Sequence, residues 1–289
     1  MKTKSCCWFV TDLASSTPVS RTNPVSTDLT QARLKRQPDI QLPGGKCRIN
    51  HLAVVSPDML LLSNWSKQCV QLLDCLKGEV VSEVQLQDYP YKLCLTDRNS
   101  AAVKVGDTRI QMINVKDMKL TLGKGLSVSG RICGLTSSRN SLVLSYGRQP
   151  WIEVISIDGK VPHKFDKSGN SLNFWYPSFM CTTPGGSVFI SDYATNKITK
   201  VDKQLTTFTS PLLQVPYGIT SVTEDQILVC SCNTNSLLLL QPSANTMFTL
   251  LEEKDGIVAP SALTYCPGQK KVYVVPSYNT DKIKVYQIS

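Results

Sequence analysis

Cations and aromatic rings are the residues in this sequence best suited to bind a partner. Both kinds fall in polar, turn-forming stretches between short apolar runs. The cations are Lys46, Lys67, Arg109, Arg148, Lys197 and Lys282. The rings are Trp65, Tyr91, Trp151, Trp175, Tyr176, Tyr217 and Tyr278. Such a mixture can bind single-stranded nucleic acid through phosphates and stacked bases, or it can anchor a protein partner.

Residues for catalysis or metal binding are sparse. The chain has only two histidines, His51 and His163, and no Gly-x-Ser-x-Gly motif. Its eleven cysteines include no C-x-x-C pair, and zinc sites need closely spaced Cys and His. We therefore expect no catalysis, no cofactor and no bound metal.

A recurring motif indicates which elements position the cations and rings. The stretch from Pro177 to Asp202 contains short strand-like runs separated by Pro-Gly-Gly and Asp-Tyr-Ala-Thr-Asn turns. The motif aligns with four other stretches of the chain without gaps inside it, and the first residue of its central run, Val188, marks the position in each. The matching positions are Leu60, Leu142, Ile227 and Tyr273. A further copy, Val103–Val115, fits with a shortened turn, which makes six copies spaced by about forty residues.

Repeats of four short strands with this period are typical of β-propeller blades, which bury their faces by stacking around an axis. The sequence thus predicts an all-β, six-bladed β-propeller over residues 38–289, after a flexible Ser/Thr-rich segment over residues 1–37. The last blade has only three strands, so we expect Asp39–Leu42 to fill its open edge. The inner strands should begin near Ile49, Tyr91, Ile132, Ser178, Gly218 and Ser261.

The motif also resembles a known repeat. Val188-Phe189-Ile190-Ser191-Asp192, followed by Asn196-Lys197-Ile198, is similar to the NHL repeat. The chain from about residue 40 resembles the six-bladed NHL propeller that ends tripartite-motif (TRIM-NHL) proteins of invertebrates. This resemblance implies an interaction scaffold, with substrate recognition in ubiquitin pathways as its setting. The zinc spacing of a RING or B-box and a coiled coil are missing, which argues against ligase activity in this chain.

The resemblance leaves three functions open. In such propellers the loops that carry the cations and rings share one face, and some NHL propellers bind RNA there. We favour a non-catalytic protein-interaction scaffold, with single-stranded RNA binding on the same face as the alternative. A calcium-dependent six-bladed hydrolase is less favoured, because the predicted inner-strand entries contain no carboxylate and calcium needs several.

Composition bears on partner and location. The net charge of +9 favours an anionic partner. No run reaches the roughly 20 apolar residues of a membrane helix, and the N-terminal apolar run is too short for a signal peptide. We expect a cytoplasmic protein that does not bind membranes and, without a coiled coil, is a monomer.

Overall fold

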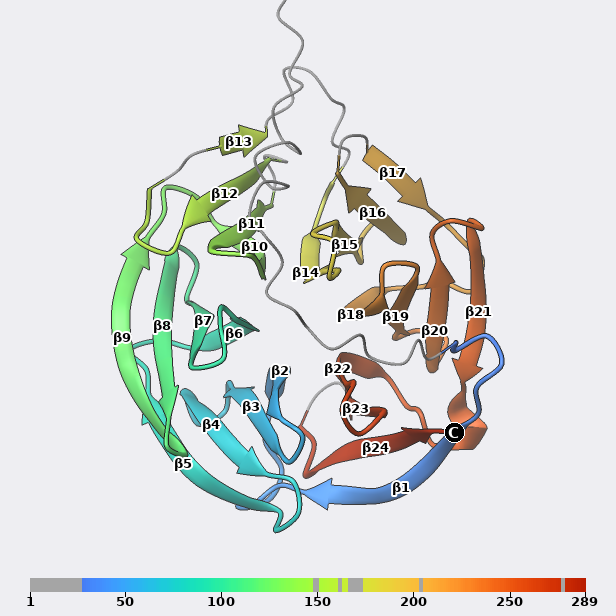
Figure 1. Ribbon diagram of the computed structural model, residues 1–289, viewed down its shortest axis with the longest axis horizontal. Coiled ribbons are helices and arrows are strands. Elements are labelled where there is room, and N and C mark those ends of the chain that lie inside the picture. The colour runs from blue at the N-terminus through green and yellow to red at the C-terminus, as the bar shows by residue number, and fades with distance from the viewer. Residues whose placement is uncertain (1–27, 148–150, 161–162, 166–173, 203–204, 277–278) are drawn as a thin grey trace, which may run out of the picture.

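The computed structural model describes residues 28–147, 151–160, 163–165, 174–202, 205–276 and 279–289. These residues form six four-stranded antiparallel sheets around a central axis, together with one short 3-10 helix, η1 (Glu253–Asp255) (Figure 1). The predicted all-β, six-bladed β-propeller is confirmed. In the described part of the chain, no helix has the length and apolar character needed to cross a membrane.

The strands are given blade by blade, from the axis outward. Blade 1 contains β2 (Ile49–Ser56), β3 (Met59–Asn64), β4 (Cys69–Asp74) and β5 (Glu79–Gln85). Blade 2 contains β6 (Pro90–Leu95), β7 (Ser100–Val105), β8 (Arg109–Lys116) and β9 (Lys119–Ser127). Blade 3 contains β10 (Ile132–Ser138), β11 (Ser141–Tyr146), β12 (Ile152–Ser156) and β13 (His163–Phe165). Blade 4 contains β14 (Pro177–Thr182), β15 (Val188–Asp192), β16 (Lys197–Val201) and β17 (Leu205–Phe208). Blade 5 contains β18 (Pro216–Thr223), β19 (Gln226–Ser231), β20 (Ser236–Gln241) and β21 (Thr246–Leu251). Blade 6 contains β22 (Pro260–Cys266), β23 (Lys271–Pro276), β24 (Lys282–Ile288) and β1 (Leu34–Gln41).

The inner strands begin close to the predicted residues. β2 and β10 begin at Ile49 and Ile132, as predicted. The other four inner strands begin at a proline, one or two residues before the predicted start. Proline is tolerated at the first residue of a strand, where it removes no essential ladder hydrogen bond.

The N-terminal strand β1 closes the ring as the outermost strand of blade 6 (Figure 1). It runs antiparallel to β24, with Leu34 opposite Ile288 and Gln41 opposite Lys282. The strand begins at Leu34, four residues before the expected domain boundary at residue 38, and Leu29 before it is fully buried. Residues 35–39 carry no strand-like apolar pattern, so the sequence gives little sign of this start, although an outermost strand tolerates polar side chains.

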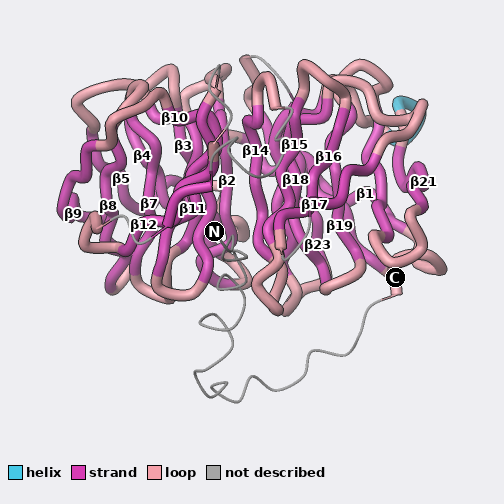
Figure 2. Tube along the Cα trace, turned by 90° about the horizontal axis from the view of Figure 1, so that it is seen from above, coloured by secondary structure: helices cyan, strands magenta, loops and turns pink. Residues whose placement is uncertain are grey.

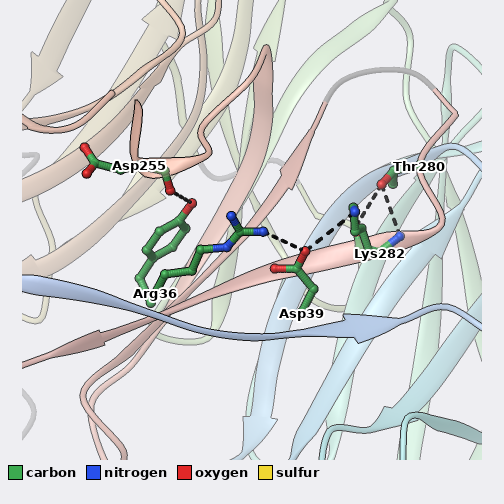
Figure 3. A network of polar contacts seen from close by, with 6 residues as sticks. Arg36, Asp39, Asp255, Thr280 and Lys282 are labelled. Atoms are coloured by element: carbon green, nitrogen blue, oxygen red, sulfur yellow. Dashed lines mark hydrogen bonds and ion pairs between the residues drawn. The ribbon is translucent and has the colours of Figure 1, made fainter. Parts of the chain in front are cut away.

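An ion pair within the closing strand and a second one to β24 help to hold this edge. The carboxylate of Asp39 lies 3.2 Å from Arg36 Nη2 and 3.7 Å from Lys282 Nζ (Figure 3). On the same blade the Tyr286 hydroxyl donates a hydrogen bond of 3.2 Å to the Asp255 carbonyl. Lys282, predicted to bind a partner, therefore helps to close the ring.

Buried serines in the second strands join neighbouring blades. Ser63, Ser145 and Ser191 occupy equivalent positions and are fully buried. Their hydroxyls donate hydrogen bonds to carbonyl oxygens at the start of the next blade's inner strand, namely those of Tyr91 (3.0 Å), Pro177 (2.6 Å) and Tyr217 (2.8 Å). The repeat motif thus supplies contacts between blades as well as strands within them.

Loops cover two opposite faces of the disc (Figure 2). Because strands alternate in direction, the starts of the inner strands, the turns between second and third strands, and the connections between blades lie on one face. We call this face the mouth face, since the central channel opens there between the inner strands. It is the face on which we expected the cations and rings to lie.

Candidate functional site: a basic pocket at the channel mouth

A pocket of about 360 Å³ lies where the channel opens on the mouth face. Residues from or next to all six inner strands contribute to it. Its lining comprises Arg48, Ile49, Asn50, Tyr91, Lys92, Lys104, Asp107, Arg131, Ile132, Cys133, Gly147, Tyr176, Ser178, Phe179, Tyr193, Tyr217 and Ser261. This volume is at the lower end of the range for ligand-binding clefts. We call it the mouth pocket.

Two buried lysines give the mouth pocket its character. Lys92 on β6 is 9% exposed, and its Nζ lies 2.8 Å from the centre of the Phe179 ring. Lys104 on β7 is 5% exposed; its Nζ lies 3.9 Å from the centre of the Tyr91 ring and donates a hydrogen bond of 2.7 Å to the Gly106 carbonyl. Among the described residues, neither ammonium group has an ion-pair partner. Buried lysine is uncommon unless it is paired, so this arrangement calls for a functional explanation.

Burial weakens the proton affinity of both amines, and the charge of Lys104 weakens that of Lys92 further. Burial lowers the pKa of Lys104 to about 8. The pKa of Lys92 lies well below its ordinary value, first because of burial and then because of the positive charge of Lys104. An anion entering the pocket would reverse both effects, since an opposite charge nearby favours the protonated amine.

Two arginines extend the positive charge toward the rim. Arg131 Nε lies 3.2 Å from Asp107 Oδ1, and both side chains are more than half exposed. Arg48 lies with its guanidinium carbon 5.0 Å from the centre of the Trp65 ring, and its Nε donates to Asn50 Oδ1 at 2.9 Å. In the described lining, Asp107 is the one carboxylate, and it is engaged by Arg131.

A chain of aromatic rings in contact with one another lines the pocket on the side of blades 4 and 5. Tyr193 stacks on Tyr176 at 5.2 Å and meets Tyr217 edge-on at 5.6 Å. Tyr217 lies 5.8 Å from Phe179, which also stacks on His51 at 5.7 Å. His51 lies on β2 and Phe179 on β14, inner strands on opposite sides of the axis (Figure 1), so their stacked rings meet across the channel.

The motif aspartate positions part of this aromatic lining. Asp192 is buried, and its carboxylate accepts backbone N–H bonds from Trp175 (2.6 Å), Tyr176 (3.1 Å) and Ala194 (3.1 Å). It therefore joins the turn after β15 to the connection that enters blade 4. Asn196 does the same for the next blade, because its Oδ1 accepts the N–H of Val215 at 2.7 Å.

The thiol in the lining and the imidazole next to it are poor candidates for nucleophilic catalysis. Burial raises the pKa of the Cys133 thiol despite the opposing effect of Lys104, Arg131 and Lys92. Burial, and then the charge of Lys92, lowers the pKa of His51 to about 3, so its ring stays neutral. No group of three or more His, Cys, Asp or Glu side chains in the described ranges is arranged to hold a metal ion.

The structure brings some of the predicted partner-binding residues together. Tyr91, Tyr176 and Tyr217 line the mouth pocket. Lys46, Trp65, Lys67, Trp175 and Lys197 also lie on the mouth face, as do Arg109 and Lys282, which begin third strands as Lys197 does. Trp65 stacks on Tyr89 at 4.4 Å, whereas Trp175 is 70% exposed.

Others are engaged within the propeller or cannot be placed. Arg109 donates a hydrogen bond to Gln87, and Lys282 pairs with Asp39. Trp151 stacks on the buried Tyr146 at 4.8 Å and so packs into blade 3. Arg148 and Tyr278 lie outside the described residues.

The pocket lysines were missed by sequence reasoning. Lys92 and Lys104 stand inside the runs Pro90–Leu95 and Ser100–Val105, where a charged residue reads as solvent-facing in a half-buried strand. The available signal was a single lysine within an otherwise apolar run on two consecutive strands. Arg131 directly precedes the predicted inner-strand start at Ile132, and Tyr193 lies in the predicted Asp-Tyr-Ala-Thr-Asn turn, but the sequence pattern assigns neither residue to the site.

Exposed apolar side chains also lie on the mouth face, in the connections between blades. Four of the large hydrophobic residues that are exposed precede an inner strand, and so lie on the mouth face. They are Tyr89 (39% exposed), Trp175 (70%), Leu212 (39%) and Val258 (50%). Exposed apolar groups around a polar centre are typical of interaction surfaces.

Comparisons with known proteins identify the fold. No family model matches the chain, and no curated protein sequence does. Virginiamycin B lyase from Staphylococcus aureus, solved as a catalytically inactive variant with quinupristin, is similar with a TM-score of 0.64 at 14% identity, covering 88% of this chain and 99% of the lyase. The Cps50 (Swd1) β-propeller domain of Myceliophteria thermophila matches with a TM-score of 0.61 at 11% identity, over 83% and 84% of the two chains. A chain of a nidogen/laminin complex matches with a TM-score of 0.59 at 14% identity, over 74% and 83%. At such identities the similarity shows the fold alone, and the chain is a six-bladed β-propeller.

Proposed function

We propose that this protein is a non-catalytic binding module that holds a protein partner on the mouth face. The observation that carries the proposal is the pairing of a recessed basic pocket with exposed apolar side chains on a single face. Such a face supplies buried anchors through its rings and selects anionic groups through its cations.

The non-catalytic assignment rests on the chemistry of the lining. Acid–base catalysis needs a donor and an acceptor with suitable pKa values near the same substrate atom. The described lining has one carboxylate, which is ion-paired, a thiol whose pKa is raised, and two lysines whose ammonium groups lie against aromatic rings rather than beside an acid–base partner. A calcium-dependent hydrolase would need several carboxylates at this position.

A protein partner is favoured over single-stranded RNA by the state of the rings. Tyr176 and Tyr193 stack on each other, and Trp65 stacks on Tyr89, so these rings have at most one face free for a base. Leu212 and Val258 are aliphatic and offer no stacking surface at all. The buried core of a protein–protein interface accepts aliphatic side chains readily.

We further propose that the partner is a substrate-like protein, as the resemblance to tripartite-motif propellers implies, and that binding takes place in the cytoplasm. The roles of Asp192 and Asn196 support that resemblance, because both motif residues fix the connections between blades. One of the similar folds belongs to a protein solved in a complex with another protein, nidogen with laminin.

Single-stranded RNA is the second candidate, favoured by the exposed cations Lys46 and Lys67 on the same face. RNA binding through phosphates should weaken with salt, with a slope of about −0.7 per phosphate contact. The full chain can be titrated with a pool of random single-stranded RNA at two salt concentrations.

The test of the proposed function is selection from a random-peptide display library on the full chain. We expect enriched peptides whose binding is lost when Trp175→Ala removes the most exposed ring of the mouth face. The matched control is Phe248→Ala, which removes an exposed ring from the outer strand β21. Peptides that bind both variants equally, or an RNA pool that binds through the mouth face where no peptide does, would overturn the proposal.

A further inference from the structure

We propose that Lys92 and Lys104 form a recessed oxyanion site in the mouth pocket that takes a carboxylate or phosphate group from an acidic segment of the protein partner. This inference rests on the proposed function and adds the chemistry that the partner must carry. Neither lysine has a role in the sequence-based predictions.

The two ammonium groups have donors to spare. An ammonium group has three N–H bonds. Lys104 uses one on the Gly106 carbonyl and faces the Tyr91 ring with another part of the group. Lys92 lies against the Phe179 ring, and no hydrogen-bond acceptor contacts it among the described residues. Several N–H bonds are thus left for an acceptor that the described chain does not supply.

Burial within one shared pocket distinguishes these two lysines from the others, including Lys284, which is 8% exposed but does not line the pocket. Surface lysines are solvated and need no partner, but these two are at least nine-tenths buried and open into the same pocket. Desolvated ammonium groups side by side repel each other, and an anion between them removes that repulsion. The carboxylate of the lining, Asp107, is held at the rim by Arg131 and so is already engaged.

The shape of the pocket limits what can enter. Phe179 lies against Lys92, and its ring also contacts His51 and Tyr217, so aromatic side chains narrow the space beside the lysines. A pocket of about 360 Å³ holds a few side chains and excludes a folded element. An extended segment can place an acidic side chain there while its flanks contact the exposed apolar groups on the mouth face.

Carboxylate and phosphate share the chemistry of an oxyanion, and the experiment must separate them. Three fluorescein-labelled nonapeptides would differ only at the centre, which carries three glutamates, one phosphoserine or three glutamines. Fluorescence anisotropy with the full chain measures each dissociation constant, and inorganic phosphate serves as a competitor. We expect the glutamine peptide to bind at least tenfold more weakly than the better of the two acidic peptides.

The variants assign the effect to the two lysines. Lys92→Met and Lys104→Met should each weaken acidic-peptide binding at least tenfold, while Lys92→Arg, which keeps the charge, should lose less. Lys116→Met is the matched control, because Lys116 is exposed at the far end of β8, and it should stay within twofold of the parent. Thermal unfolding of each variant shows that the propeller is intact.

The outcomes separate this inference from the proposed function. Tenfold losses at both lysines support the oxyanion site, and the tighter acidic peptide identifies its source. Display-selected peptides that depend on Trp175 but tolerate both methionine variants would overturn the oxyanion site and leave the proposed function standing. If no selected peptide depends on the mouth face, both the oxyanion site and the proposed function are overturned. If RNA depends on the same two lysines and binds more tightly than every peptide, the assignment of the ligand to a peptide is overturned.

Discussion

At the scale of single residues, the two buried lysines of the mouth pocket lower the stability of the fold. Lys92 and Lys104 occupy strand positions that an apolar side chain would fill at lower free energy, since a buried ammonium without a partner is unfavourable. Functional sites commonly carry such local costs. The effect on stability can be tested without knowledge of the partner.

Replacing Lys104 by methionine should stabilise the protein. The folded-state pKa of Lys104 is lowered to about 8 from 10.5, so the unfolded chain binds more protons between these values and stability rises with pH across that window. Below pH 8 Lys104 is protonated in both states, and the buried ammonium group lowers the free energy of unfolding by its full amount. Lys104→Met should therefore raise the free energy of unfolding at pH 7 by about 1–3 kcal/mol and reduce the gain between pH 8 and 10. Urea unfolding at several pH values measures both effects, with Lys116→Met as the control, and a less stable Lys104→Met protein would contradict the argument.

The neutral ring of His51 should make the fold sensitive to acid. Its folded-state pKa is about 3, against 6.5 for an ordinary histidine, so the unfolded chain takes up a proton first as the pH falls. The contribution of His51 to stability is complete above pH 6.5 and is lost at up to about 1.4 kcal/mol per pH unit between pH 6.5 and 3. His51→Phe, which can still stack on Phe179, should lose less stability than the parent between pH 7 and 4.5. Equal losses in parallel urea titrations would show that His51 does not contribute.

At the scale of elements, the closing strand β1 contributes more to the packing of the propeller than its polar sequence suggests. Ile40 is buried in the large cluster that joins blades 1, 4, 5 and 6, and Asp39 connects two cations on the same sheet. The sequence predicted that an N-terminal segment fills the open edge, because three strands in a last blade leave unpaired backbone groups. It did not predict the start at Leu34, since an outermost strand needs few apolar residues.

Truncating Ile40 should weaken the propeller as a core substitution does. Ile40→Ala should lower the free energy of unfolding by about 2–4 kcal/mol, because it leaves a cavity where β1 packs on the ring. Val81→Ala on the outer strand β5 is the control, since Val81 is 37% exposed and should lose well under half as much. Chemical unfolding compares the two directly. Similar small losses in both proteins would mean that β1 is a loosely attached edge.

At the scale of the whole molecule, the ring was predictable and the pocket was not. The forty-residue period runs through the blades and the recurring serine stands in blades 1, 3 and 4, so both are visible in the sequence one blade at a time. The mouth pocket combines Lys92 and Lys104 of blade 2 with Phe179 of blade 4, which rests on His51 of blade 1. These residues come into contact only when the ring closes, and no spacing along the sequence indicates that contact.

The two faces of the disc provide the most direct test of the central claim, which is that a protein partner binds at the channel mouth. A photo-crosslinking amino acid, p-benzoylphenylalanine, can replace Trp175 or Leu212 on the mouth face, and Leu76 or Met118 in turns on the opposite face. All four positions are exposed, so a difference in crosslinking between them shows where the peptide binds and not which position solvent can reach. Each full-chain protein would be irradiated with a biotin-labelled peptide selected from the display library. We predict crosslinks from Trp175 and Leu212 but not from Leu76 and Met118, and crosslinks confined to Leu76 or Met118 would contradict the claim.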